Sequence, residues 1–367
     1  MTPPQRRPTS VDVAALAGVS RATVSMVLNG RTEGTVSTAN QKRVLDAAAE
    51  LGYTRSALAI SLKERRTRTI GLITDEIATS PFAGRMARAA SLAAARENYM
   101  VITMDLSLRD HTVDDAARLL AERQVDGLIY ATMGRIRVPL PKTPPGLPLV
   151  LLNCEIDVSD DANGADSDAA AALSTFLPDD RGGARRAARR LVDTGHRRIA
   201  MLSDDRISEA GRERESGFRE ELATAGITPR VIPTGWQMDD GYRVTSRLLA
   251  EEEPPTGLFC IRDRVAGGAL HAAAAAGVDV PRELSVIGFD DEDFFAERLT
   301  PPLTTIALPH EEMGEQAMVA LLGVLGVGPE GDRAAEGGPA GAAAASRAIV
   351  VECPLVERES VGIVPTV

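Results

Sequence analysis

The chain has 367 residues, of which 44% are hydrophobic and 25% charged, and its formal net charge is −11. This length allows two or three domains with cores of their own, and the composition excludes a disordered or fibrous protein. The sequence contains no apolar run of about 18 residues, so we expect no membrane span. Its first ten residues lack the apolar stretch of a secretory signal, so we expect a cytoplasmic protein.

The distribution of charge indicates a possible partner, and the cysteines indicate the compartment. Residues 1–68 contain eleven Lys and Arg against five Asp and Glu, a balance of +6 that leaves −17 for the remainder. A basic segment on an acidic body indicates that only the segment meets a polyanion, although a solvated basic face has the same charge. Cys154, Cys260 and Cys353 lack metal-site spacing, so we expect buried thiols in a reducing compartment.

The first predicted helix begins at Thr9, which is followed by Asp12 in a capping pattern, and it ends at Gly18, which suits a left-handed C-cap. A second helix follows after a very short turn, begins at Ser20 and covers 21–28. A third helix begins after Ser37 and ends at Gly52. The inward positions that we expect in the three helices are Val13, Leu16, Ala17, Val24, Leu28, Val44, Leu45, Ala48 and Leu51.

Two helices joined by so short a glycine-containing turn predict a helix-turn-helix, whose second helix enters the major groove of DNA. A helical bundle without nucleic acid would have the same apolar stripes. It would not explain the outer face of the second helix, which carries short or hydrogen-bonding side chains suited to bases and phosphates. These side chains are Arg21, Ala22, Thr23, Ser25 and Asn29.

From residue 70 the chain alternates apolar strands with helical segments. The predicted strands are 70–74, 101–105, 126–131, 149–153, 198–202, 231–233, 257–261, 285–289 and a final one within 347–360. The predicted helices lie near 83–97, 114–123, 217–226, 241–250 and 267–277. This alternation predicts two lobes of similar build, each with a parallel sheet covered by helices on both faces.

In open sheets of this kind, ligands bind at the carboxyl ends of the strands, here in the cleft between the lobes. Planar carboxylate, amide and guanidinium groups bind sugar hydroxyls, and an aromatic face covers apolar ring carbons. Strand ends and nearby loops supply this mixture, with Phe82 in the loop 75–82. The expected pocket residues are Phe82, Asn153, Arg214, Trp236, Asp263, Asp290 and Asp291.

The strings DVAALAGVSRATVSMVLNG (12–30), VLDAAAELGY (44–53), SLKERRTRTIGLI (61–73) and VPRELSVIGFDDEDF (280–294) occur in this order. Together they resemble the lactose/galactose repressor (LacI/GalR) family of bacterial transcription regulators. The resemblance implies a helix-turn-helix domain at 1–53, a hinge helix at 54–68 and a two-lobed effector-binding and dimerisation domain at 69–367. The two-lobed domain is similar to periplasmic sugar-binding proteins.

The resemblance implies that Arg21, Ala22 and Met26 read bases, whereas Thr23, Ser25 and Asn29 are assigned to phosphates. Family members usually carry arginine where this chain has Met26. Arginine binds guanine with two hydrogen bonds, but methionine offers only an apolar contact, for instance to a thymine methyl. We therefore expect an operator that differs from the common consensus at this base pair. Alternatively, Met26 packs on the protein core and reads nothing.

In the resembling family, a hinge helix folds on DNA and inserts a leucine from each subunit into the minor groove, where Leu62 is the matching residue. A helix of about eight residues is marginal alone, so we expect it to fold only on DNA and beside its twin. Arg55 and Ser56 replace a usual Pro-Asn pair and Ile60 replaces a polar residue, which leaves the entry geometry open. A basic solvated linker is the alternative.

By resemblance, Arg214, Trp236, Asp290 and the pair Arg262–Asp263 match effector-contacting positions. Arg262 departs from the family, which usually has asparagine there. It either binds a carboxylate or phosphate of the ligand or pairs with Asp263 or Asp290. Asp263 and Asp291 also follow strands in positions where aspartate caps a helix.

These features predict a homodimer that binds double-stranded operator DNA under the control of a small-molecule effector, a sugar or sugar derivative, with no cofactor and no metal. We expect the Gly/Ala-rich segment 326–346 to be a mobile surface segment. The sequence after the final predicted strand has no leucine heptad repeat, so we do not expect a tetramer held by a coiled coil. A transport-type sugar-binding protein is the alternative. An enzyme is not expected, because His310-Glu311 meets glycine at position 314, where a zinc-protease motif needs histidine, and no phosphate loop occurs.

Overall fold

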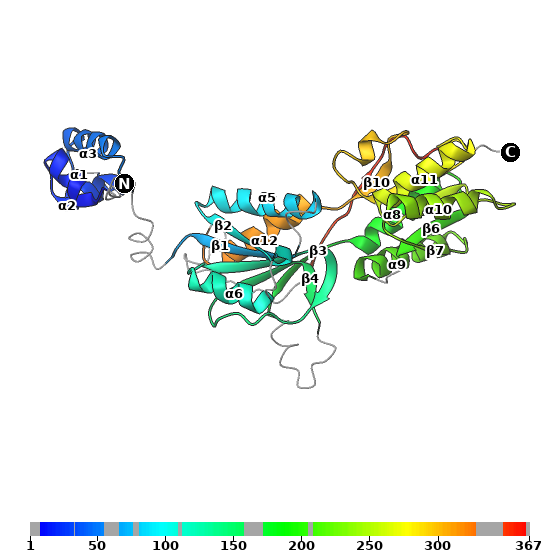
Figure 1. Cartoon of the computed structure of the whole chain (residues 1–367), viewed down its shortest axis with the longest axis horizontal. Helices are drawn as coiled ribbons and strands as arrows, with labels where there is room; N and C mark the ends of the chain where they lie inside the picture. The colour runs from blue at the N-terminus through cyan, green and yellow to red at the C-terminus, as the bar shows by residue number, and fades with distance from the viewer. Residues whose placement is uncertain are drawn as a thin grey trace, which may run out of the picture. The chain divides into compact units, whose positions relative to one another are not determined.

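The structure is a computed structural model, and it describes residues 8–32, 34–54, 66–75, 81–108, 112–157, 172–204, 208–327 and 348–364. The chain divides into two compact units, Met1–Thr67 and Arg68–Val367 (Figure 1). The smaller unit is helical, and the larger unit combines helices with largely parallel sheets. The predicted fold class is therefore confirmed.

The smaller unit contains α1 (Ser10–Ala17), α2 (Arg21–Leu28) and α3 (Thr38–Glu50). Thr9 caps α1, because its hydroxyl accepts from the Asp12 amide and its own amide donates to the Asp12 carboxylate at 2.7 Å. Gly18 ends α1 at φ +63°, a left-handed conformation that favours glycine. Ser20 and Ser37 cap α2 and α3 through their hydroxyls. The predicted helix starts are confirmed.

The core of the smaller unit comes from all three helices and consists of Val13, Ala14, Ala17, Val24, Val27, Val44, Ala47 and Ala48. Two predicted inward positions are wrong, since Leu16 is 47% and Leu45 is 54% exposed. Consecutive residues of a helix point about 100° apart, so once Val44 faces inward, Leu45 faces away and Ala47 and Ala48 follow on the inner face.

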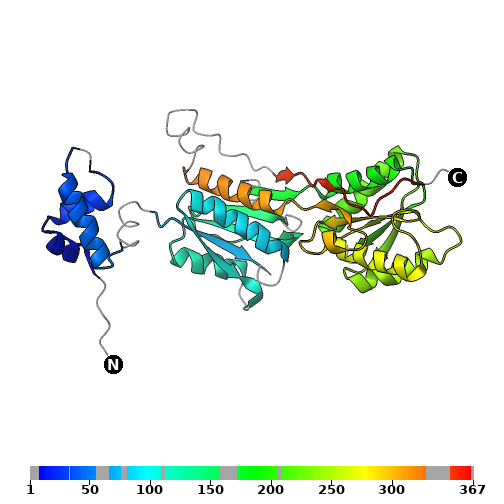
Figure 2. The same ribbon diagram turned by 90° about the horizontal axis from the view of Figure 1, so that it is seen from above.

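The larger unit contains two six-stranded sheets, and the first has the order β11-β5-β4-β3-β1-β2 with parallel neighbours throughout. Its strands are β1 (Thr69–Thr74), β2 (Met100–Asp105), β3 (Gly127–Val138), β4 (Leu149–Ile156), β5 (Ser174–Pro178) and β11 (Ala348–Val351). One face packs against α5 (Pro81–Arg96) and α12 (His310–Val324), which lie side by side in Figure 2, in cyan and orange. The other face packs against α6 (Val113–Glu122).

The second sheet has the order β12-β10-β9-β8-β6-β7, and only β12 runs antiparallel to its neighbour. Its strands are β6 (Ile199–Asp204), β7 (Arg230–Thr234), β8 (Gly257–Cys260), β9 (Ser285–Asp290), β10 (Thr304–Ala307) and β12 (Leu355–Val356). The helices α8 (Asp180–Asp193) and α9 (Glu209–Thr224) pack together, as do α10 (Met238–Leu249) and α11 (Asp263–Ala276). Phe289 faces α8, whereas its neighbour Gly288 faces α11, so these helices cover opposite faces.

The described chain passes between the two sheets from β5 to α8, from β10 to α12 and from β11 to β12 (Figure 1). The single final strand predicted within 347–360 is wrong: this segment forms two short strands, one in each sheet. The segment crosses from the first sheet to the second between β11 and β12, so it cannot form one continuous strand. The two lobes are therefore joined by three chain segments, and each segment follows directly after the end of a strand. The tail segment 328–346 lies outside the described residues.

Candidate DNA-binding surface and effector site

The first two helices have the geometry of a helix-turn-helix. α1 and α2 are bent by 104° at a break of few residues, within the roughly 90–120° of this motif. Their length and composition together also fit a bent membrane segment, whereas no single helix in the described part of the chain is long and apolar enough to cross a membrane. Val24 and Val27 are buried against the other helices and so fix which face of α2 points outward.

The outward face of α2 carries the side chains predicted to contact DNA. Arg21, Ala22 and Ser25 are exposed, as is Asn29 just past the helix end. Asn29 turns back onto the helix, where its Nδ2 donates to the Ser25 carbonyl at 2.6 Å and to the Ser25 hydroxyl at 3.2 Å. Met26 is half-buried and lies outside the apolar cluster of this unit. This position favours base contact over core packing, but the DNA contacts stay predictions.

Two further predictions on DNA contact concern Thr23 and Leu62. Thr23 is half-buried, and its amide donates to the Ser20 hydroxyl at 3.1 Å. Leu62 and the hinge segment 55–65 lie outside the described residues. The minor-groove wedge therefore stays a prediction.

In the larger unit, Arg214 lies at the centre of a buried charge cluster. It comes from the second turn of α9 and is 5% exposed. Its Nε donates to Asp180 Oδ1 at 2.8 Å, and its Nη1 donates to the Ile261 carbonyl at 2.6 Å and to Asp290 Oδ1 at 3.4 Å. The guanidinium also lies 3.6 Å from the centre of the Phe289 ring. The end of β9 thus supplies both a carboxylate and an aromatic face to this arginine.

Arg262 and Trp236 lie beside this cluster. Arg262 is the N-cap residue of α11, and its Nε donates to Asp290 Oδ2 at 3.3 Å. Its guanidinium lies 4.9 Å from the Trp236 ring, and its side chain is 18% exposed. Of the alternatives for Arg262, the structure contains the pairing with Asp290. Asp290 therefore accepts from two arginines at once.

Asp263 and Asp291 hold the backbone around the cluster. The fully buried Asp263 carboxylate accepts from the Glu292 amide at 2.8 Å and from the Thr305 hydroxyl at 2.5 Å. Asp291 binds Arg358 at 2.7 Å. Neither aspartate is a helix N-cap, so the predicted capping role is wrong. Both Asp263 oxygens are bonded within the protein, and its contact with an effector stays a prediction without support from this geometry.

Asn153 and Phe82 belong to the other lobe. Asn153 is 3% exposed at φ +61°, and its Nδ2 donates to the carbonyls of Thr132 at 3.1 Å and Met133 at 3.0 Å. Its Oδ1 is buried and has no hydrogen-bond partner within the described residues. Phe82 belongs to the first turn of α5 and not to a loop, which corrects the prediction. Its side chain lies outside the described structure.

Asp180 and Arg135 are two members of this cluster that the sequence analysis missed. Asp180 begins α8 and is fully buried, and its Oδ2 lies 3.7 Å from Arg135 Nη1. Arg135 comes from β3 of the first sheet and binds Glu155 at 3.1 Å. The result is a row of alternating charges that crosses between the lobes: Glu155, Arg135, Asp180, Arg214, Asp290 and Arg262. Asp180 follows closely after β5 (Ser174–Pro178), so a prediction of this strand would have marked Asp180 as a pocket residue at a strand end.

Burial dominates the electrostatics of these carboxyl groups. It raises the pKa of Asp180 against the opposing effect of Arg214 and Arg135, and it raises the pKa of Asp290 against Arg262 and Arg214. Removing an arginine would therefore leave a carboxylate that burial already disfavours. No group of three or more His, Cys, Asp or Glu suited to a metal ion occurs among the described residues.

Four consecutive acids, from the last residue of β9 onward, each bind a different arginine. The pairs are Asp290–Arg262, Asp291–Arg358, Glu292–Arg264 and Asp293–Arg85. Asp290 and Asp291 have φ +119° and +52°, conformations that L-residues rarely adopt. Arg85 comes from α5 beside the first sheet, so this strained segment links the cluster to the other lobe.

His310 at the start of α12 predicts an acid sensitivity of the larger unit. Burial lowers its pKa to about 3, with further lowering by Arg85 and Arg214. Its folded-state pKa thus lies below the unfolded value, so His310 destabilises the fold as pH falls below about 6.5. We expect the stability of the wild type relative to His310→Gln to fall by about 2 kcal/mol between pH 7 and pH 5. Urea unfolding followed by Trp236 fluorescence measures this, and a pH-independent difference would contradict it.

The comparisons with known proteins agree with this architecture. Residues 10–56 match a family described as bacterial regulatory proteins, lacI family, and residues 167–361 match a periplasmic binding protein-like domain. An uncharacterized HTH-type transcriptional regulator of Streptomyces limosus is 36% identical over 86% of this chain and 87% of its own. The HTH-type transcriptional repressor PurR of Photobacterium profundum is 32% identical over 85% and 90%. A solved complex of the regulator CelR with cellobiose is 28% identical, covers 96% of this chain and all of its own, and has a TM-score of 0.58.

The fold thus defines a helix-turn-helix unit joined to a two-lobed unit of the periplasmic-binding type. Proteins built in this way are DNA-binding transcription regulators. This chain belongs to the LacI family of bacterial regulatory proteins.

Proposed function

We propose that this protein is a dimeric repressor that binds operator DNA through α2 and Leu62 and is controlled by a small polyhydroxylated effector bound between its lobes. In this proposal residues 1–53 bind DNA, 54–68 form the hinge, and 69–367 bind the effector and form the dimer. The protein acts in the cytoplasm without a cofactor and catalyses no reaction. The repressor named PurR among its relatives supports the direction of regulation.

The row of alternating charges, which is buried at its centre, is the observation that carries the proposal. It runs from Glu155 in one lobe to Arg262 in the other, and the Trp236 ring lies beside its end. A ligand that replaces one link changes the partners of the next, because each inner member binds two neighbours. The cluster therefore offers a physical route from effector binding to the relative position of the lobes.

The cluster also indicates the chemistry of the effector. Asn153 Oδ1 is a buried acceptor without a hydrogen-bond partner in the described structure, and Asp180 Oδ2 has only the long ion pair with Arg135 at 3.7 Å. Hydroxyl groups can donate to such oxygens, and the faces of Trp236 and of sugar ring carbons are complementary. The three arginines of the row are matched by three acids, so a neutral ligand leaves the buried charge balanced. The relative solved with cellobiose supports a sugar.

Both the expected symmetry of the operator and an exposed strand of the larger unit favour a dimer. Two operator half-sites require a two-fold axis. In the body, β2 is an edge strand, and its Met100 and Ile102 are 61% and 37% exposed. An exposed apolar edge strand is a pairing surface. We propose that β2 meets its copy in the second subunit, which would place two hinge segments side by side.

A thermal-shift screen of neutral mono- and disaccharides, sugar acids and sugar phosphates on the full chain tests the effector proposal. The expected result is a neutral sugar that raises the melting temperature of the body and changes Trp236 fluorescence with the same concentration dependence. The melting temperature of Trp236→Phe should still rise, but less. If no neutral sugar acts, or only charged ones do, the proposed effector class is wrong.

A further inference from the structure

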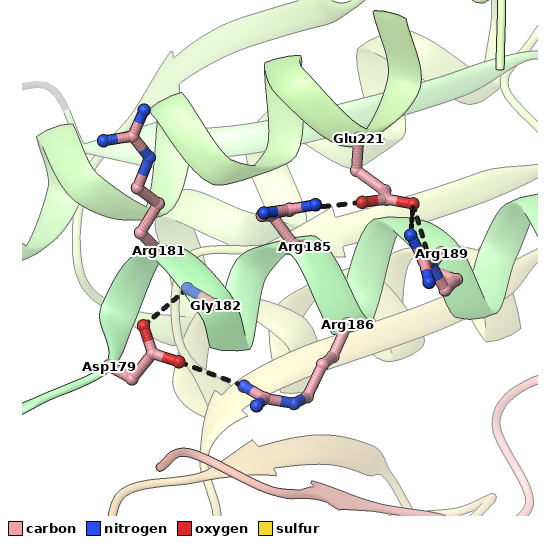
Figure 3. A pocket seen from close by; sticks show the side chains of 7 residues that line it. All are labelled: Asp179, Arg181, Gly182, Arg185, Arg186, Arg189 and Glu221. Carbon is pink, nitrogen blue, oxygen red and sulfur yellow. Dashed lines mark hydrogen bonds and ion pairs between the residues drawn. The ribbon is translucent and has the colours of Figure 1, made fainter. Parts of the chain in front are cut away.

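A surface pocket that opens to solvent lies between α8 and α9. Its volume is about 400 Å³, and arginines dominate its lining, with Glu221 and Asp179 as the acids (Figure 3). Cavities of about 300–1,000 Å³ are large enough for small ligands. Arg181, Arg185 and Arg189 follow at intervals of four residues, so they share one face of α8.

Two arginines of this pocket share a single bonded carboxylate. Arg181 has its own carboxylate, Glu220. Arg185 and Arg189 share the single buried carboxylate of Glu221: Arg185 Nε donates at 3.3 Å and Arg189 Nε at 2.7 Å. Figure 3 shows both guanidinium groups beside Glu221. The pair therefore has one directly bonded carboxylate for two guanidinium groups, and Glu220 acts on Arg185 from further away.

Hydrogen-bond donors remain available at the same place. Only the Nε of Arg185 has a partner in the described structure, so its two Nη groups are open to a ligand. The nitrogen Nη1 of Arg189 and that of Arg181 likewise have no partner there. A guanidinium presents its nitrogens in a planar fork that matches the oxygens of a phosphoryl group.

The two helices that line the cavity are held rigidly. A Cβ on Gly217 of α9 would lie 2.1 Å from the Arg181 carbonyl of α8, so the backbones are in contact. The same helices carry Asp180 and Arg214, which bind each other at 2.8 Å in the interlobe row. A ligand that bridged α8 and α9 would therefore stabilise the pair that holds the row together.

We propose that the cavity between α8 and α9 is a binding site for a phosphorylated small molecule, separate from the effector site, with Arg185 and Arg189 as its main contacts. A phosphoryl dianion would add negative charge beside two arginines that share one bonded carboxylate, and it would accept from several nitrogens at once. The site does not depend on the interlobe effector or on DNA. Its failure and that of the proposed function are thus distinguishable.

Calorimetric titration of the full chain with pyrophosphate at low ionic strength tests this site. Arg185→Gln should bind pyrophosphate about tenfold more weakly, a change of about 1.4 kcal/mol. Arg189 still holds Glu221 in this variant, so the fold is preserved. Glu221→Gln should bind more tightly, because it frees both arginines. Arg190→Gln is the matched control on another face of α8, where Arg190 pairs with Glu357, and it should bind as the wild type does.

The basic DNA-binding unit also attracts anions, but equally in every variant, so the differences between variants report on the cavity. Citrate, titrated in parallel, distinguishes phosphoryl groups from carboxylates. The proposal is overturned if Arg185→Gln and Arg190→Gln bind pyrophosphate alike. It is also overturned if citrate binds the wild type as tightly as pyrophosphate does.

Discussion

Replacing Arg214 by methionine is expected to cost the body about 3–5 kcal/mol of stability and to abolish its response to the effector. The methionine fills a similar volume but leaves Asp180 and Asp290 without their shared partner. Asp180 is fully buried and would keep only Arg135 at 3.7 Å. An uncompensated buried carboxylate is either protonated or destabilises the fold, and both outcomes break the interlobe row.

Trp236 is the single tryptophan of the chain, so its fluorescence in urea reports on the body alone. Arg219→Met is the matched control, because Arg219 lies on the same helix in an exposed pair with Glu215, worth at most about 1 kcal/mol. Adding Asp180→Asn to Arg214→Met should restore part of the stability but not the effector response. Equal stability of the Arg214 and Arg219 variants would show that the row has no energetic role.

Replacing Met26 by arginine is expected to change which operator the protein selects. Arginine at this position can form two hydrogen bonds with guanine, whereas methionine contacts only apolar groups. At the facing base pair, we expect the variant to prefer guanine over the base of the wild-type operator by about 1–3 kcal/mol, roughly 5- to 150-fold. Met26 is half-buried and outside the apolar core, so the substitution should not disturb the fold.

Base-by-base selection from a randomised half-site measures this preference for both proteins. Ser25→Ala serves as the control, since loss of a phosphate contact weakens binding to all sequences about equally. If the wild type already selects guanine at that position, or if the variant keeps the wild-type operator, Met26 does not read the base.

Local signals in the sequence predicted the helices whose ends are marked by capping residues. The caps at Thr9, Ser20 and Ser37 and the left-handed Gly18 fixed the first three helices almost to the residue. These devices act within four residues, so a single sequence contains all the information needed. The inward faces were less certain. Leu16 and Leu45 were misplaced because hydrophobicity alone does not fix the rotation of a helix.

The interlobe cluster shows what local signals cannot predict. β5 and α8 were missed: β5 is only five residues long, and α8 is rich in arginine and short of large apolar residues. Asp180, at their junction, was therefore overlooked, although it holds Arg214. The residues predicted for the effector site from strand ends, a loop and a helix start do lie together: Arg214, Asp290, Arg262 and Trp236. Which carboxylate each arginine binds depends on how the chain passes between the two lobes, and no fixed sequence spacing predicts those connections.

The central claim is that the body controls whether the basic unit holds DNA. Its most direct test is selection of duplexes from a random pool by the full chain at low ionic strength, followed by titration of the selected duplex with the sugar from the thermal-shift screen. The account predicts a two-fold symmetric site whose affinity changes about 5- to 150-fold when that sugar saturates the body. A protein that enriches no duplex, or one whose affinity for the enriched duplex is the same with and without the sugar, would contradict it.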